Sequence, residues 1–315
     1  MHSKGVLAFL VWTFGNILAL PLFGLVLRYL PASRGWLKFT PLFFIFLYVE
    51  YFAITLNLQA IKSALGGGID ISSFVFVKGD LITPIVIITG LAIVFFINKY
   101  GLKGSMLTDI GQYAVQLVGV VTLAGAGYLL GERMDLLWLT PDGRDWLLFG
   151  FLGIITGALG TGHQWQRFSA FEGRDVLRIG LWGGLFFGIY MFFVYLSGLF
   201  FTQNIILGVI FLIIILSVAT STIDSAVAGL QFIARKFKLD PRAGSLVAII
   251  AVMVWPFLSE KGLTNLWGIM VQVRYPTVLI AVGLTAMYHI FKPNSKIRTQ
   301  ATGVLQKYLI MFKGE

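Results

Sequence analysis

The sequence contains no cysteine, and only 3 of its 315 residues are histidine. Without cysteine the chain can form no disulfide, no thiolate metal site and no cysteine nucleophile. The three histidines, His2, His163 and His289, are too far apart in the sequence to suggest a histidine metal centre. No nucleophile–base pair, phosphate-binding loop or metal-ligand spacing appears either, so the sequence does not predict an enzyme or an organic cofactor.

Charged residues are also scarce, because they make up 12% of the chain against about a quarter in a typical soluble domain. Apolar residues account for 57%, and the mean hydropathy is +0.86. A water-soluble fold could not bury so much apolar surface, and a disordered chain would contain far less of it. The sequence therefore predicts an all-α polytopic membrane protein whose main partner is the lipid bilayer.

The net charge of +10 fits this class of protein. Basic residues of membrane proteins concentrate in cytoplasmic loops, whereas nucleic-acid binding would require a basic groove with interleaved aromatic residues. No segment of this sequence has that second pattern, so we expect no nucleic-acid partner.

Nine segments have the length and composition of transmembrane helices, each of which needs about 20 apolar residues. The alternation of loops places 17 Lys and Arg residues on one side of the membrane and 6 on the other. This asymmetry predicts a multi-pass protein of the cell membrane, with its N-terminus outside and its C-terminus in the cytoplasm. The nine predicted spans are Gly5–Leu30, Phe39–Ile61, Leu81–Asn98, Met106–Leu130, Trp146–Gly162, Ile179–Phe201, Ile205–Phe232, Gly244–Leu258 and Leu263–Phe291.

Apolar and charged residues alternate with helical spacing over Gln164–Arg178. This pattern predicts an amphipathic helix on the inner membrane surface.

One predicted span carries a stripe of oxygen-bearing side chains. Val218, Ser221, Asp224 and Ser225 share one helical face, and Thr222 lies at its edge. Ser and Thr hydroxyls can bond to carbonyls of the preceding turn or join helices. However, a carboxylate in mid-span is costly unless it faces a cavity or a partner, so Asp224 favours an ion or polar pathway.

Three further ionisable residues fall within spans and allow alternative interpretations. Asp109 lies near the start of its span, where a helix dipole alone would favour an acid. Glu50 is in mid-span and could act on a substrate or pair with Arg274. Arg274 and Gln272 precede a proline that frees carbonyls, so they join Glu50 as candidate substrate or gate residues. His163 belongs to the same candidate set, although its place at a span end favours an interfacial side chain.

Three stretches in this order resemble motifs of the sodium/solute symporter family, which includes sodium–sugar, sodium–proline and pantothenate carriers. The first joins a glycine turn, Tyr100–Lys103, to Thr108–Gln112, which is similar to the family's Thr-Asp-x-x-Gln helix start. The second, Gln164–Ala170, resembles a Gln-Arg-x-x-Ala-Ala signature. The third, Ser221–Ser225, is similar to the Ser-Thr-x-Asp-Ser of core helix 8.

The resemblance implies a five-plus-five inverted-repeat fold within a single membrane domain, residues 1–315. Residues 1–130 would form a partial first repeat with core helices 2–5, and residues 146–291 a second repeat with core helices 6–10. Residues 292–315 would form a basic cytoplasmic tail. The resemblance leaves core helix 1 and the helices after core helix 10 without a counterpart in this sequence.

The resemblance also implies a function, which is sodium-coupled symport of a small polar or anionic solute by alternating access. Ser221 and Thr222 match sodium-ligating hydroxyls, and Val218 matches a ligating carbonyl. Asp109, Asp224 and Ser225 match polar residues that line an ion pathway or a second ion site. Sugar transport is disfavoured because Gly5–Leu30 contains no acidic residue. The alternative is a transport-inactive structural or regulatory subunit, in which a helix of another membrane protein fills the vacant first position.

Overall fold

The computed structural model describes residues 5–29, 40–66, 76–77, 79–130, 132–133, 137–141, 144, 147, 157–169, 171, 174–201 and 205–259. Six helical segments among them are long and apolar enough to cross a membrane. This confirms the prediction of an all-α multi-pass membrane protein. Helices suit such a chain because every backbone N–H and C=O in hydrocarbon must be hydrogen-bonded internally.

Besides the long helices, the described residues include two short 3-10 segments, η2 (Gly79–Leu81) and η3 (Gly157–Gly160), and one small strand pair. In that pair, β1 (Glu132–Arg133) lies antiparallel to β2 (Phe200–Phe201). The α-helices are α1 (Val6–Tyr29), α2 (Thr40–Leu65), α3 (Ile82–Leu130), α5 (Gly162–Phe168), α6 (Arg174–Ser197), α7 (Ile205–Lys236) and α8 (Pro241–Ser259).

α3 contains two of the predicted spans, Leu81–Asn98 and Met106–Leu130, joined at a turn. Gly101 has φ 60° and ψ −150° there, a conformation that glycine adopts without the steric cost of a Cβ. The second part of the helix resumes directly after Gly101, a few residues earlier than predicted. Most of the predicted span Trp146–Gly162 and all of Leu263–Phe291 lie outside the described residues.

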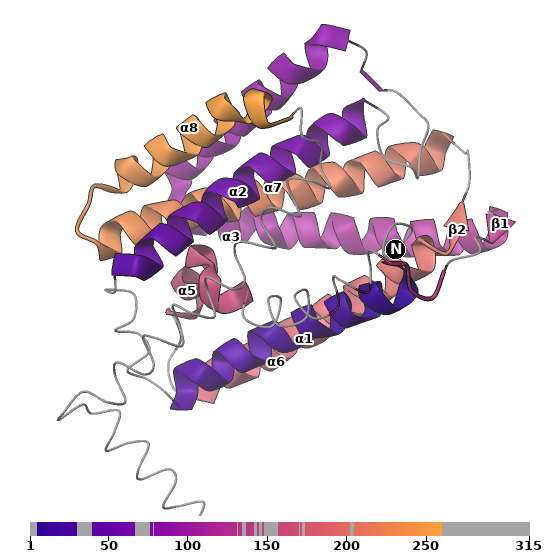
Figure 1. The fold of residues 1–315 in the computed structure, drawn as a ribbon, viewed down its shortest axis with the longest axis horizontal. Coiled ribbons are helices and arrows are strands. Elements are labelled where there is room, and N and C mark those ends of the chain that lie inside the picture. The colour runs from indigo at the N-terminus through magenta and orange to yellow at the C-terminus, as the bar shows by residue number, and fades with distance from the viewer. Residues whose placement is uncertain are drawn as a thin grey trace, which may run out of the picture.

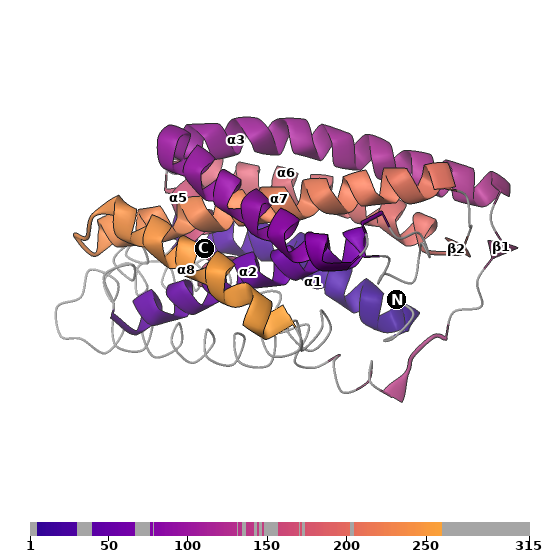
Figure 2. The same cartoon turned by 90° about the horizontal axis from the view of Figure 1, so that it is seen from above.

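The helices are arranged in two groups, which Figure 1 shows one above the other. α1 and α6 pack closely along their length and form one group, while α2, α7, α8 and the first part of α3 form the other. The second part of α3 packs on α7 and also reaches α6, where Tyr113 Oη donates to the carbonyl of Phe186 at 3.0 Å. Because it contacts helices of both groups, α3 links them, and Figure 2 shows this helix running along one edge of the molecule.

Two apolar clusters lie inside the structure. The first surrounds Phe23 of α1, whose ring centroid is 4.9 Å from those of Trp165 and Phe168 in α5. The second joins α2, α3, α7 and α8 around side chains such as Leu58 and Trp255. α7 contributes to both clusters and therefore occupies the centre of the fold.

The predicted surface helix over Gln164–Arg178 is wrong. The segment is divided between α5 and the start of α6, and α5 is an internal element. Trp165 is 2% exposed and Phe168 is 4% exposed, because both pack on Phe23. The alternation of apolar and charged residues belongs to a short, largely buried helix, in which His163 pairs with Glu50 and Arg167 pairs with Asp109.

Glycines allow the backbones of α1 and α6 to approach one another. Gly180, Gly184 and Gly188 are spaced four residues apart on the face of α6 that packs on α1. A Cβ at Gly184 would lie 2.4 Å from the carbonyl oxygen of Ile17 in α1. Small residues at this spacing are typical of close helix pairs in membranes, where dispersion contacts replace the hydrophobic effect.

Candidate cation site at the junction of α3, α5 and α7

Three elements bring polar side chains together in the interior of the structure. The second part of α3 supplies Ser105, Thr108 and Asp109, which share one helical face through their spacing of three and four residues. α7 supplies its hydroxyl and carboxylate stripe, and α5 supplies Arg167. The turn at Gly101 positions this cluster, since it directs the following turns of α3 towards α7.

Asp109 connects all three elements. Ser221 Oγ of α7 donates to Asp109 Oδ1 at 2.5 Å, and the guanidinium of Arg167 pairs with Oδ2. The same Arg167 nitrogen donates to Ser225 Oγ at 2.8 Å. Asp109 is the eighth residue after Gly101, so a stabilising position in the first turn of a helix does not explain it. Its structural role is to bind α7 and α5 to α3.

Asp224 is the more deeply buried carboxylate, with 2% of its surface exposed. Ser105 Oγ donates to its Oδ1 at 3.0 Å and Thr108 Oγ1 donates to Oδ2 at 2.8 Å. Ser225 Oγ also donates to Oδ1, at 3.2 Å. Ser225 therefore links the two carboxylates, because it accepts from the arginine that pairs with Asp109.

The predicted sodium ligands Val218, Ser221 and Thr222 lie together and are half-buried. Thr222 Oγ1 donates to the carbonyl of Val218 at 2.9 Å, a bond to the preceding turn of the kind considered as the alternative to an ion role. This bond uses the hydroxyl proton and leaves lone pairs on both oxygens. The same holds for Ser221, whose proton is directed at Asp109. All three oxygens thus retain lone pairs that can coordinate a cation.

The ligand chemistry of this junction suits a hard cation. Carboxylate, hydroxyl and carbonyl oxygens are the donors preferred by ions such as sodium, magnesium and calcium. The Asp109 and Arg167 side chains are 21% and 28% exposed, so this edge of the cluster lies at the surface of the structure. Among the described residues, no group of three or more His, Asp or Glu side chains is arranged to hold a metal ion.

Beyond Asp109 along α3, this helix is joined to α7 by a series of hydrogen bonds between amide and hydroxyl groups. Gln112 Nε2 donates to Thr220 Oγ1 at 2.9 Å, and Gln116 Nε2 donates to Ser217 Oγ at 3.3 Å. Ser217 Oγ in turn donates to the carbonyl of Gln112 at 3.1 Å. These hydroxyls join helices, which is the structural role considered for the polar stripe, and they fix α3 and α7 relative to one another.

A second polar centre is formed by Glu50 and His163. The Glu50 side chain is fully buried, and its Oε1 accepts from the backbone N–H of His163 at 3.1 Å. His163 Nδ1 lies 3.0 Å from Oε1 and 3.2 Å from Oε2. A Cβ at Gly229 of α7 would lie 2.8 Å from both Glu50 Oε1 and the backbone nitrogen of His163, so this glycine leaves room for the pair. The His163 side chain thus points towards Glu50 inside the protein.

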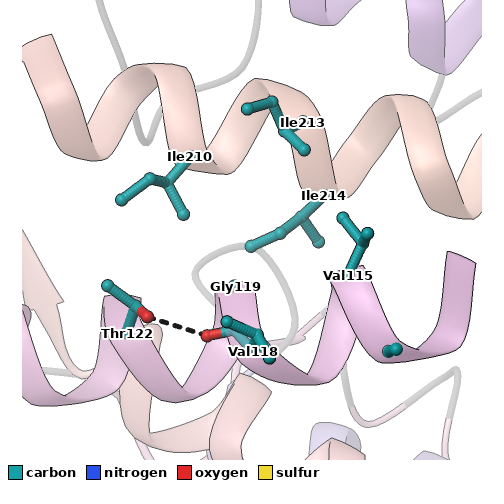
Figure 3. A pocket seen from close by; sticks show the side chains of 8 residues that line it. Val115, Val118, Gly119, Thr122, Ile210, Ile213 and Ile214 are labelled. Carbon is teal, nitrogen blue, oxygen red and sulfur yellow. Dashed lines mark hydrogen bonds between the residues drawn. The ribbon is translucent and has the colours of Figure 1, made fainter. Parts of the chain in front are cut away.

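An apolar groove of about 480 Å³ lies further along the same two helices (Figure 3). The only side-chain hydroxyl drawn among its lining residues, Thr122 Oγ1, donates to the Val118 carbonyl at 2.8 Å and is therefore satisfied within α3. The lining of this groove is almost entirely apolar, so the groove does not suit a polar solute. It is lined by Ala114, Val115, Val118, Gly119, Thr122, Ile210, Ile213 and Ile214.

The structure adds three residues to the candidate site residues predicted from the sequence, and two of the predicted residues lie outside the part of the chain that it describes. Ser105, Thr108 and Arg167 join the cluster, although the sequence analysis assigned them no site role. Helical spacing from Asp109 could have indicated the first two, but no local pattern pairs Arg167 with a residue 58 positions away. Gln272 and Arg274 lie outside the described residues, so the predicted pairing of Glu50 with Arg274 stays a prediction.

No protein-family model and no curated protein matches this chain.

Proposed function

We propose that this protein is a sodium-coupled symporter that moves a small polar or anionic solute across the cell membrane by alternating access. The proposal includes the inverted-repeat fold of the sodium/solute symporters, with the N-terminus outside. The observation that carries it is the Asp109–Ser221 hydrogen bond. This bond links a carboxylate of α3 to a hydroxyl of α7, both of them residues that the resemblance associates with the ion.

The packing of the helices supports an inverted repeat. In such a fold each core helix of the first repeat corresponds to the core helix numbered five higher in the second repeat. In the numbering that the resemblance implies, α1, α2 and the first part of α3 are core helices 2, 3 and 4, and α6, α7 and α8 are core helices 7, 8 and 9. α1 packs on α6, α2 packs on α7, and the first part of α3 contacts α8 through Gly90 and Val252. The helices that would correspond to one another are therefore neighbours in all three cases, as expected close to a pseudo-two-fold axis in the membrane plane.

The two helix groups supply the parts that alternating access requires. In transporters of this type, one bundle rocks against the other around a fixed binding site. Here the pair α1–α6 would move relative to α2, α7 and α8, and the cation junction lies where α7 meets α5 and the second part of α3, the helix that links the two groups. A sodium ion at Ser221, Thr222 and the Val218 carbonyl would stabilise one arrangement of α3 and α7, and its inward gradient would drive the solute.

Sodium alone provides a test that needs no knowledge of the solute. We expect sodium chloride to raise the thermal unfolding temperature of the purified protein in lipid nanodiscs, when choline chloride keeps the ionic strength constant. A ligand that binds the folded state at ten times its Kd stabilises that state by about 1.4 kcal/mol. The rise should saturate with sodium, and potassium should not reproduce it. Equal unfolding temperatures in all three salts would reject the proposal.

One observation favours a second candidate, a transport-inactive structural or regulatory subunit. The Arg167 guanidinium already pairs with Asp109 and donates to Ser225, so the cluster is bonded internally without any ion. Fixed in this way, the junction would serve only to hold α3, α5 and α7 together. This candidate predicts that thermal stability is indifferent to sodium and that the protein purifies with a stoichiometric membrane partner.

A further inference from the structure

We infer that Arg167 is a tethered competitor for the cation, and that its guanidinium must leave Asp109 before sodium binds with full affinity. The inference rests on the proposed function and assigns a specific role to a residue outside the predicted ion site. It starts from the geometry of one carboxylate. Asp109 Oδ1 accepts from Ser221, and its Oδ2 pairs with Arg167.

Asp109 is the one carboxylate bonded to a predicted sodium ligand among the described residues. Without it, an ion at Ser221 would be coordinated by hydroxyl and carbonyl oxygens, which carry no formal charge. With it, the ion gains the attraction of a full negative charge inside a partly buried site. Arg167 already neutralises that charge, so it opposes sodium both by occupying the oxygen and by its own positive charge.

The surroundings of Arg167 allow it to leave. Its side chain is 28% exposed, and a long aliphatic stem lets a guanidinium reach water while the stem stays in place. It originates from α5, a helix of only seven residues that begins at Gly162 and is followed by the exposed Ser169. The pair is partly exposed, and a cation that binds the vacated oxygens would itself compensate the charge of Asp109, so it can displace the guanidinium.

The test measures the sodium concentration that gives half of the thermal stabilisation, in the wild type and in Arg167→Gln. Glutamine keeps a hydrogen-bond donor but removes the charge. We expect the half-saturating concentration to fall about tenfold, which corresponds to about 1.4 kcal/mol. Arg178→Gln is the matched control, because Arg178 is an exposed arginine on α6 and its loss should leave the value unchanged.

The absence of native cysteine provides a second test on a single folded preparation. Arg167→Cys should also bind sodium more tightly than the wild type. Modification with the cationic reagent 2-aminoethyl methanethiosulfonate restores a positive charge at this position and should weaken sodium binding again. Modification with neutral methyl methanethiosulfonate should not.

The outcomes separate this inference from the proposed function. A sodium response in the wild type with no gain in Arg167→Gln rejects the competitor role and leaves the symporter proposal standing. A response that appears only in the variant supports the competitor role and rejects sodium coupling in the wild type. No response in either protein rejects both. If neither variant folds, or the two reagents act alike, Arg167 is structural and the inference is wrong.

Discussion

Alanine at both Ser221 and Thr222 should remove the sodium-dependent rise in thermal stability. The double substitution deletes the two hydroxyl oxygens that we assign to the ion and leaves the Val218 carbonyl and the Asp109 carboxylate. At a sodium concentration ten times the wild-type Kd, we expect the stabilisation to fall from about 1.4 kcal/mol to nearly zero. The measurement is the difference in unfolding temperature between sodium and choline, so a general loss of stability does not affect the conclusion.

A matched control for this variant removes two hydroxyls elsewhere. Thr89 and Thr122 of α3 each donate to a carbonyl of their own helix, at 2.8 Å in both cases. Alanine at these two positions should leave the sodium response intact. If the Ser221/Thr222 variant responds to sodium as the wild type does, the ion does not bind at the stripe of α7.

Alanine at Gly184 should destabilise the packing of α1 on α6 by about 3 kcal/mol, at the upper end of the usual cost of overpacking. The new Cβ would lie 2.4 Å from the carbonyl oxygen of Ile17 and 3.1 Å from Cδ of Pro21. A backbone atom cannot rotate away as a side chain can, so the two helices must separate. Thermal unfolding in nanodiscs measures the change.

Gly125→Ala is the control for this substitution, because it adds the same methyl group to a helix. Apart from its chain neighbours and the adjacent backbone of its own helix, no atom of the described residues lies within 4 Å of a Cβ at Gly125. Alanine favours helix over glycine by up to about 1 kcal/mol, so this variant should be neutral or slightly stabilised. Equal stability of the two variants would contradict the close approach of α1 and α6.

The hydropathy of the sequence was sufficient to predict the class of fold and the positions of most helices. Long apolar segments can only be helical in a bilayer, which is why α1, α2, α6, α7 and α8 agree with predicted spans within a few residues. The turn in α3 could also be anticipated, because Gly101 is flanked by polar residues between two apolar segments.

The short helix α5 shows what hydropathy could not predict. Hydropathy assigns apolar side chains to lipid and charged side chains to water. The mixture of Trp165, Arg167 and Phe168 in α5 therefore predicts a helix at the membrane surface. In the structure Arg167 and His163 instead meet carboxylates of α3 and α2, far away in the sequence. Such pairs depend on tertiary packing, and a single sequence contains no local signal for them.

The most direct test of the cation site is equilibrium binding of radioactive sodium to the purified protein. The account predicts saturable binding of about one ion per chain, displaced by unlabelled sodium and not by choline, and lost when Asp109 is replaced by Asn. Absence of saturable binding to the wild type, or full binding to Asp109→Asn, would contradict the assignment of the α3–α5–α7 junction as a cation site.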